Sequence, residues 1–257
     1  MQPVKPVTLH LTGNIHVAPT ADELYDDLAH ALVAASTSAV DERGVFHLAL
    51  SGGSTPERFY MRLVMDTRYR VIPWKQTHLW IVDERRVPPD DEKSNFRMIS
   101  ETLADHIPTR RRQIHPMPAT HDDAAGIYEN ELRRAFGRDP GQTDPPALDF
   151  VLLGMGEDGH TASLFPQSPA LNERLRWIAI NTGPAVTPPD RVTMTFPLLN
   201  RAREIAVLVT GAKKSEALRR VDAQLHSNGP EPQNLPITGI DPEEEQLIWY
   251  LDAEAAE

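Results

Sequence analysis

The chain has 257 residues, of which 40% are hydrophobic and 25% are charged, as is usual for a globular protein. Its formal net charge of −11 opposes sequence-independent binding to nucleic acid, which depends on many Lys and Arg contacts to phosphates. The absence of cysteine excludes disulfides, thiol nucleophiles and thiolate metal sites. No stretch approaches the roughly 20 apolar residues that cross a bilayer, and residues 1–6 lack the apolar core of a secretory signal. We therefore expect a cytoplasmic protein without nucleic-acid or membrane partners.

Short apolar runs alternate with amphipathic segments along the chain. Thr20 and Glu23 have the spacing of a capping box, in which each residue satisfies a free N–H group of the other, and they predict a helix start. Pro56 suits the first position of a later helix, where no N–H group is needed. Apolar residues at helical spacing predict helices over residues 24–35, 56–64, 96–103, 128–136 and 218–225, and a short helix is also expected after residue 153. The predicted strands cover residues 45–50, 78–82, 148–153, 177–180, 192–196, 205–209 and 247–251.

This alternation predicts one α/β domain over residues 1–257, with a mainly parallel, Rossmann-like open sheet sandwiched by helices. Ligands of such sheets bind beyond the carboxyl ends of the strands. The loops that follow the strands are therefore where functional residues are expected.

The loop after the strand at residues 45–50 is typical of a phosphate site. Gly52 and Gly53 permit a close backbone approach, while Ser54 and Thr55 offer hydroxyl groups. The helix that follows directs its free N–H groups back at the loop, which is how a phosphate is held without a large positive charge. A plain strand-to-helix turn is the alternative interpretation.

The loop after the strand at residues 78–82 carries two carboxylates and two guanidinium groups in residues 83–86. Arg85 is suited to binding phosphate, because a guanidinium group has parallel N–H donors that can bind two oxygens at once. Asp83 belongs to the same candidate site. A local cluster of surface ion pairs is the alternative.

Residues 154–159 match the G-x-G-x-x-G spacing of a dinucleotide-binding loop. We reject a nicotinamide site, because the next strand ends at Asn181 and not at the acidic residue that would bind a ribose. The motif also lies past the middle of the chain. The better interpretation is a Gly-rich turn that presents Asp158 and His160 at a strand end. Histidine is suited to proton transfer near neutral pH, and a nearby carboxylate can orient it.

Two later segments add cations. Arg191 stands at the start of a predicted strand, and Lys213 and Lys214 stand at the start of a predicted helix. The helix dipole disfavours lysines there, so an anionic ligand or simple solvent exposure would explain them. The other histidines have no metal-ligand spacing, and no serine lies in a Gly-x-Ser-x-Gly turn, so neither a zinc site nor a serine hydrolase is expected.

Together these segments resemble the 6-phosphogluconolactonases, the sugar-lactone hydrolases of the pentose phosphate pathway. The resemblance covers nearly the whole chain and is carried by residues 51–56, 83–87, 94–97, 153–166, 188–191, 211–214 and 249–252. It implies an α/β fold and hydrolysis of 6-phosphoglucono-1,5-lactone to 6-phosphogluconate, with no cofactor and no required metal. It also implies that His160 is the proton-transferring residue, and we expect a monomer or a weak dimer.

On this interpretation His160 takes a proton from the attacking water, and Asp158 orients it. The Gly52–Thr55 loop and Arg85, with Arg191 and Lys214, would hold the phosphate. Asp83 would hold Arg85 or contact sugar hydroxyls.

Two alternatives differ in chemistry. Glucosamine-6-phosphate deaminases share the Gly-Gly-Ser-Thr-Pro loop and an Asp-Gly-His turn, but their His is followed by a stretch with a reactive Glu. Residues 161–166 of this chain contain no such Glu. A non-catalytic sugar-phosphate sensor would need a DNA-binding segment, and the residues before the first loop show one capped helix and no basic face.

Overall fold

The computed structural model describes residues 9–139, 141–183, 186–242 and 246–257. Residues 1–6, in which no secretory signal was expected, lie outside the described residues. No helix among the described residues is long and apolar enough to span a membrane.

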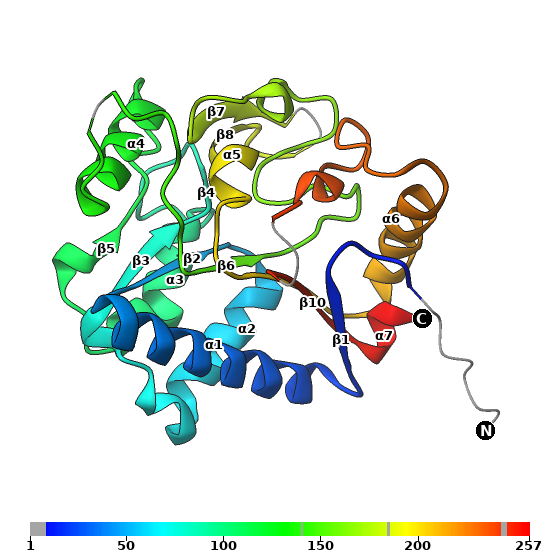
Figure 1. Ribbon diagram of the computed structural model, residues 1–257, viewed down its shortest axis with the longest axis horizontal. Coiled ribbons are helices and arrows are strands. Elements are labelled where there is room, and N and C mark those ends of the chain that lie inside the picture. Colours follow the sequence, from blue (N-terminus) through cyan, green and yellow to red (C-terminus); the bar gives the residue numbers. More distant parts are fainter. Residues whose placement is uncertain (1–8, 140, 184–185, 243–245) are drawn as a thin grey trace.

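A seven-stranded sheet with parallel pairing forms the centre of the molecule (Figure 1). Its strands in chain order are β1 (Asn14–Ala18), β2 (Phe46–Leu50), β3 (Thr77–Ile81), β5 (Ile114–His115), β6 (Phe150–Leu153), β9 (Ile205–Val209) and β10 (Leu247–Asp252). Their spatial order is β1-β10-β9-β6-β2-β3-β5. Counted from β2, this is the 3-2-1-4-5-6 order of a doubly wound sheet, with β1 added beside β10. The predicted parallel, Rossmann-like sheet is confirmed.

The central strands are buried along their whole length. Every residue of β2, β6 and β9 is buried, which explains why these strands appear in the sequence as continuous apolar runs. The helices in chain order are α1 (Ala21–Arg43), α2 (Ser54–Met65), α3 (Asn95–Thr102), α4 (Ala124–Ala135), α5 (Phe196–Leu199), α6 (Ser215–Asn228) and α7 (Ala253–Ala256). In Figure 1, α1 and α2 run below the sheet, whereas α4 and α5 lie above it. The sheet is therefore covered on both faces.

A second sheet of three antiparallel strands has the order β4-β8-β7 and was not predicted. It consists of β4 (Asp83–Arg85), β7 (Ile178–Thr182) and β8 (Asp190–Met194). The strands predicted at 177–180 and 192–196 belong here and not to the parallel sheet, since an apolar run does not specify the direction of pairing. The expected loop at residues 83–85 is a strand that has no apolar signal of its own.

Two local predictions about helices were wrong. The short helix expected after residue 153 does not form, because residues 154–168 make turns around Gly154, Gly156 and Gly159. The second helix begins at Ser54, so that Pro56 is its third residue and not its first.

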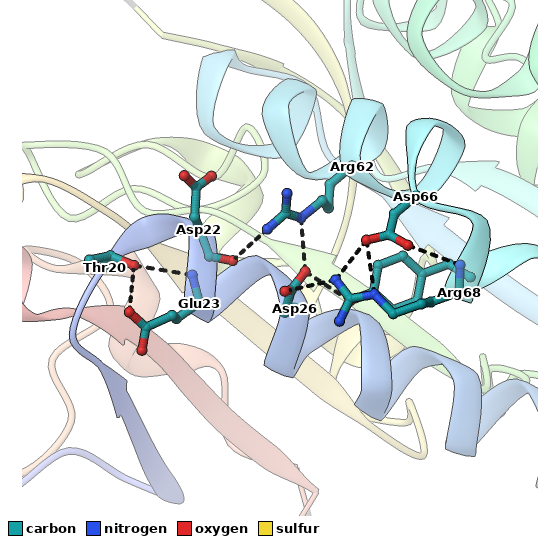
Figure 2. Close-up of polar contacts among 8 residues, drawn as sticks. Thr20, Asp22, Glu23, Asp26, Arg62, Asp66 and Arg68 are labelled. Carbon is teal, nitrogen blue, oxygen red and sulfur yellow. Dashed lines mark hydrogen bonds and ion pairs between the residues drawn. The ribbon is translucent and has the colours of Figure 1, made fainter.

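The start of α1 carries half of the predicted capping box (Figure 2). The backbone N–H of Glu23 donates to Thr20 Oγ1 at 3.2 Å. The Glu23 carboxylate accepts from the Thr20 hydroxyl, also at 3.2 Å, in place of the expected bond to the Thr20 backbone N–H. The helix ends at Arg43, and Gly44 caps it with a φ of 75°, a conformation that favours glycine.

Asp26 of α1 joins three segments of the structure (Figure 2). Its carboxylate accepts from Arg62 Nε of α2 at 2.8 Å, and from Arg68 Nη2 at 2.9 Å and the Tyr69 hydroxyl at 2.8 Å in the turn that follows α2. These bonds fix the far end of α2, whose first turn carries the predicted phosphate loop.

His47 and His78 lie near the amino ends of β2 and β3, away from the loops with the predicted site, and His115 is the last residue of the neighbouring short strand β5. His78 Nδ1 is 2.9 Å from His115 Nε2, and Trp80 Nε1 donates to His47 Nδ1 at 3.1 Å. Burial, followed by the neighbouring His78, His115 and Arg43, lowers the pKa of His47 to about 3. Burial, followed by His115 and Arg112, lowers the pKa of His78 to about 4.

These shifts predict how stability depends on pH. An unfolded histidine titrates near pH 6.5. Because the folded pKa values are lower, the unfolded state binds more protons than the native state as pH falls below about 6.5, and the free energy of unfolding falls with it. We expect urea unfolding midpoints to drop between pH 7.5 and pH 4.5, and His78→Gln to make that drop smaller. His30→Gln, at an exposed position, is the matched control. An equal drop in wild type and His78→Gln would contradict the account.

Candidate active site

The loops after β2 and β6 meet at the point where the strand order of the main sheet reverses, and such a switch point is where open α/β sheets bind ligands. A cavity of about 380 Å³ lies there. Nine of the ten predicted site residues line it, namely Gly52, Gly53, Ser54, Thr55, Asp83, Arg85, His160, Arg191 and Lys214. The tenth, Asp158, is hydrogen-bonded to His160. The structure therefore brings the predicted residues together.

The loop after β2 leads directly into α2. Gly53 precedes the helix with a φ of 112°, a conformation that favours glycine. The N–H groups of Ser54 and Thr55, in the first turn, have no partner within the helix and face the end at which the helix dipole is positive. Gly52 has no room for a side chain, because a Cβ atom there would lie 1.8 Å from Asn95 Oδ1. This geometry suits an anion that approaches the backbone closely.

His160 and Asp158 form a hydrogen-bonded pair. His160 Nδ1 lies 2.5 Å from Asp158 Oδ1, which also accepts the His160 backbone N–H at 3.1 Å. Burial acts to raise the pKa of Asp158, but the hydrogen bonds from His160 outweigh it and hold this pKa below its usual value. Asp158 is therefore ionised at neutral pH. With Nδ1 engaged by the carboxylate, Nε2 is the ring atom that remains for proton exchange.

Glycines shape the turn that carries this pair. Gly159 has a φ of 81°, and its N–H donates to the Gly156 carbonyl at 3.0 Å. A Cβ atom on Gly156 would lie 2.1 Å from His160 Nδ1. The glycine spacing that resembles a dinucleotide motif thus makes room for the imidazole ring.

Arg85 and Arg191 are direct cross-strand partners in the β4–β8 pair. Like charges placed opposite each other in a sheet repel. Arg191 is only 5% exposed, and burial, opposed by Asp83 and reinforced by the repulsion from Arg85, lowers its pKa. Its guanidinium lies over the Phe165 ring, 5.8 Å from the centroid. An anion in the cavity would relieve the repulsion between the two arginines.

Lys214 is half-buried in the cavity wall, whereas Lys213 is exposed. Lys214 Nζ donates to the Met155 carbonyl at 2.8 Å, and Met155 belongs to the turn that carries His160. Burial lowers the pKa of Lys214, although Glu157 and Asp158 act in the opposite direction. Of the two lysines, the predicted site residue Lys214 is thus the one that lines the cavity.

The acidic residues of β4 have structural partners. Ser163 Oγ donates to Asp83 Oδ2 at 2.6 Å, which ties β4 to the His160 loop. No ion pair joins Asp83 to Arg85 among the described residues, so the first of the two roles expected for Asp83 is wrong. The second, a contact with sugar hydroxyls, stays a prediction. Glu84 accepts the backbone N–H groups of Asn95 at 2.7 Å and Phe96 at 2.8 Å, which caps the start of α3. Burial raises the pKa of Glu84 despite these bonds.

Several cavity residues were not among the predicted site residues: Asn95, Met155, Ser163, Phe165 and Thr210. Thr210 Oγ1 lies 3.2 Å from Thr55 Oγ1 and so joins the end of β9 to the phosphate loop. Their positions after strands β6 and β9 or at a helix start were the available signal, but none has a side chain that by itself indicates chemistry.

Comparison with known proteins agrees with this geometry. The family model described as glucosamine-6-phosphate isomerases/6-phosphogluconolactonase matches residues 19–249. A 6-phosphogluconolactonase from Synechocystis sp. is 39% identical over 250 residues, which cover 94% of this chain and 98% of that protein. The human GDH/6PGL endoplasmic bifunctional protein is 40% identical over 247 residues, which cover 93% of this chain but only 30% of that longer protein.

The fold comparison gives the same result. The solved structure of 6-phosphogluconolactonase from Thermotoga maritima superposes with a TM-score of 0.77 at 27% identity, covering 94% of this chain and all of the other. The chain belongs to the glucosamine-6-phosphate isomerase/6-phosphogluconolactonase family.

Proposed function

We propose that this chain hydrolyses 6-phospho-D-glucono-1,5-lactone to 6-phospho-D-gluconate, the lactonase step of the oxidative pentose phosphate pathway. The observation that carries the proposal is that His160, hydrogen-bonded to Asp158, lines one cavity together with the α2 helix start and three cationic side chains. The names of the Synechocystis and Thermotoga relatives support it. We also propose that residues 1–257 are one lactonase domain that works in the cytoplasm as a monomer or weak dimer, without nucleic acid.

The phosphate would lie between the α2 helix start and Arg85. Gly52 and Arg85 both lie against the Asn95 side chain, which places the guanidinium beside the phosphate loop. Arg191 stands opposite Arg85 and adds a second positive group. These local charges allow an acidic protein to bind an anionic sugar, because charges at short distance in a partly desolvated site interact strongly. The distant surface charges that make up the net charge are screened by water and salt.

The hydrolysis is acyl transfer to water. His160 Nε2 would accept a proton from the water as its oxygen bonds to the lactone carbonyl carbon, and the carbonyl oxygen becomes an oxyanion. When the intermediate collapses, the ring C–O bond breaks and the imidazolium returns the proton to the departing oxygen. Asp158 holds the ring and stabilises its cationic form. Lys214 is hydrogen-bonded to the same turn and lines the cavity, so it is our candidate for stabilising the oxyanion.

The second candidate function is glucosamine-6-phosphate deamination, and this chain lacks a residue that the reaction needs. The deaminase pattern has a Glu a few residues after its His, whereas residues 161–166 of this chain are Thr-Ala-Ser-Leu-Phe-Pro. The Arg85 position, which is usually Tyr in deaminases, also favours the lactonase.

His160→Ala should lower kcat for the lactone by about 10² or more, because it removes the general base, while binding of the product 6-phosphogluconate persists. Asp158→Asn should cause a smaller loss, since the ring keeps its place but its cationic form loses stabilisation. Steady-state kinetics corrected for spontaneous hydrolysis measure both effects. His121→Ala, in an exposed loop, is the control. Near-normal turnover by His160→Ala would remove the assigned base.

Arg85→Ala should raise KM about tenfold or more with kcat little changed, because one charge-assisted contact to the phosphate contributes about 1.5–3 kcal/mol. Arg86→Ala is the matched control, because Arg86 donates to the Ala119 and His121 carbonyls and does not line the cavity. If Arg85→Ala lowered kcat at constant KM, the phosphate role of Arg85 would be wrong.

A further inference from the structure

Asn95 is 2% exposed, and its side chain lies between the phosphate loop and Arg85. Its Oδ1 atom accepts a hydrogen bond from Arg85 Nη1, and its Nδ2 donates to the Asp83 carbonyl at 2.7 Å. Its backbone N–H donates to Glu84. Asn95 is therefore bonded to three successive residues of β4.

The chemistry of the partners determines which way the amide points. A guanidinium group can only donate, and a backbone carbonyl can only accept. An amide, with one donor end and one acceptor end, satisfies both at once. An Asp would place a carboxylate oxygen against the Asp83 carbonyl, and an Ala would satisfy neither partner.

The hydrogen bonds that the Arg85 side chain makes to described residues use only one nitrogen of its guanidinium group. Nη1 carries two hydrogens, and it donates to Asn95 Oδ1 and, at 3.1 Å, to the Lys93 carbonyl. Nε and Nη2 have no hydrogen-bond partner among the described residues. Together they form one edge of the guanidinium group, which can bind two phosphate oxygens side by side.

We propose that Asn95 is a positioning residue that holds Arg85 with its Nε–Nη2 edge toward the substrate phosphate. This inference rests on the proposed phosphate role of Arg85. Asn95 also fills the space beside Gly52, so one side chain sets the distance between the arginine and the phosphate loop. Without it, Arg85 keeps its charge but loses its fixed direction, which weakens binding of the substrate and of its transition state equally.

The test is a double-mutant cycle on lactone hydrolysis, with inhibition by inorganic phosphate as a second readout of anion binding. Asn95→Ala should raise KM about fivefold and weaken phosphate inhibition by a similar factor, with kcat within about twofold of wild type. In the Arg85→Ala background, Asn95→Ala should change KM less than about twofold, because the group that it positions is gone. Asn95→Asp, which is close in size, should also raise KM, because its carboxylate neutralises the guanidinium. Asn95→Leu, which is close to Asn in size and has neither a charge nor a hydrogen-bonding group, carries the same cycle if the Ala variant does not fold.

Ser94→Ala is the matched structural control. Ser94 Oγ caps α3 through the Arg97 N–H at 3.1 Å and donates to Glu84 at 3.0 Å, but it does not contact Arg85. Ser94→Ala should lower the melting temperature and leave KM unchanged. If Ser94→Ala raised KM as much as Asn95→Ala does, the effect would come from the docking of α3, and the proposal would be overturned. An equal KM rise from Asn95→Ala in both backgrounds would overturn it too.

The positioning role of Asn95 and the proposed lactonase function would be contradicted by different results. If Arg85→Ala has a wild-type KM while still hydrolysing the lactone, the phosphate role of Arg85 and the role of Asn95 both fall, but the lactonase function stands. If the wild-type chain does not hydrolyse the lactone, the proposed function itself fails.

Discussion

The parallel pairing of β2 with β6 is the constraint on which the site depends. Leu48, Ala49 and Leu50 of β2 are in register with residues 150–152 of β6, and both strands are fully buried. Their carboxyl ends therefore stop at the same level, so the loop that leads into α2 and the turn that carries His160 emerge side by side. Neither loop alone makes the proposed site, since we assign anion binding to the N–H groups of one loop and proton transfer to His160 in the other. The switch in strand order opens the crevice between them.

The second sheet adds what the first lacks, namely positive charge. It places Arg85 and Arg191 opposite each other at the edge of the cavity, where their mutual repulsion costs stability in the absence of an anion. Asp83 connects this sheet to the His160 turn through Ser163, and Glu84 connects it to α3. The buried acidic residues of β4 thus fix the loops, while Arg85 lines the cavity, where we propose that it binds the phosphate. This division of roles explains how a chain with a net charge of −11 can offer a local anion site.

Most of the parallel sheet could be predicted from the sequence, because its central strands are buried on both faces and so appear as apolar runs. The second sheet could not be predicted, since β4 is a polar strand and the direction in which β7 and β8 pair depends on tertiary contacts. The site residues that carry charge or stand in glycine-rich turns were predicted because their side chains suggest chemistry. Asn95 was not, because an amide has a role only through the partners on either side of it, which the fold alone brings together.

The proposed roles of His160, Asp158 and Arg85 all require that this cavity hydrolyses a phosphorylated sugar lactone. The most direct measurement supplies the purified chain with freshly prepared 6-phosphogluconolactone and, in a parallel reaction, with glucosamine 6-phosphate. We expect lactone loss far above the spontaneous rate and no release of ammonia from the amino sugar. Ammonia release together with lactone loss at the spontaneous rate would contradict it.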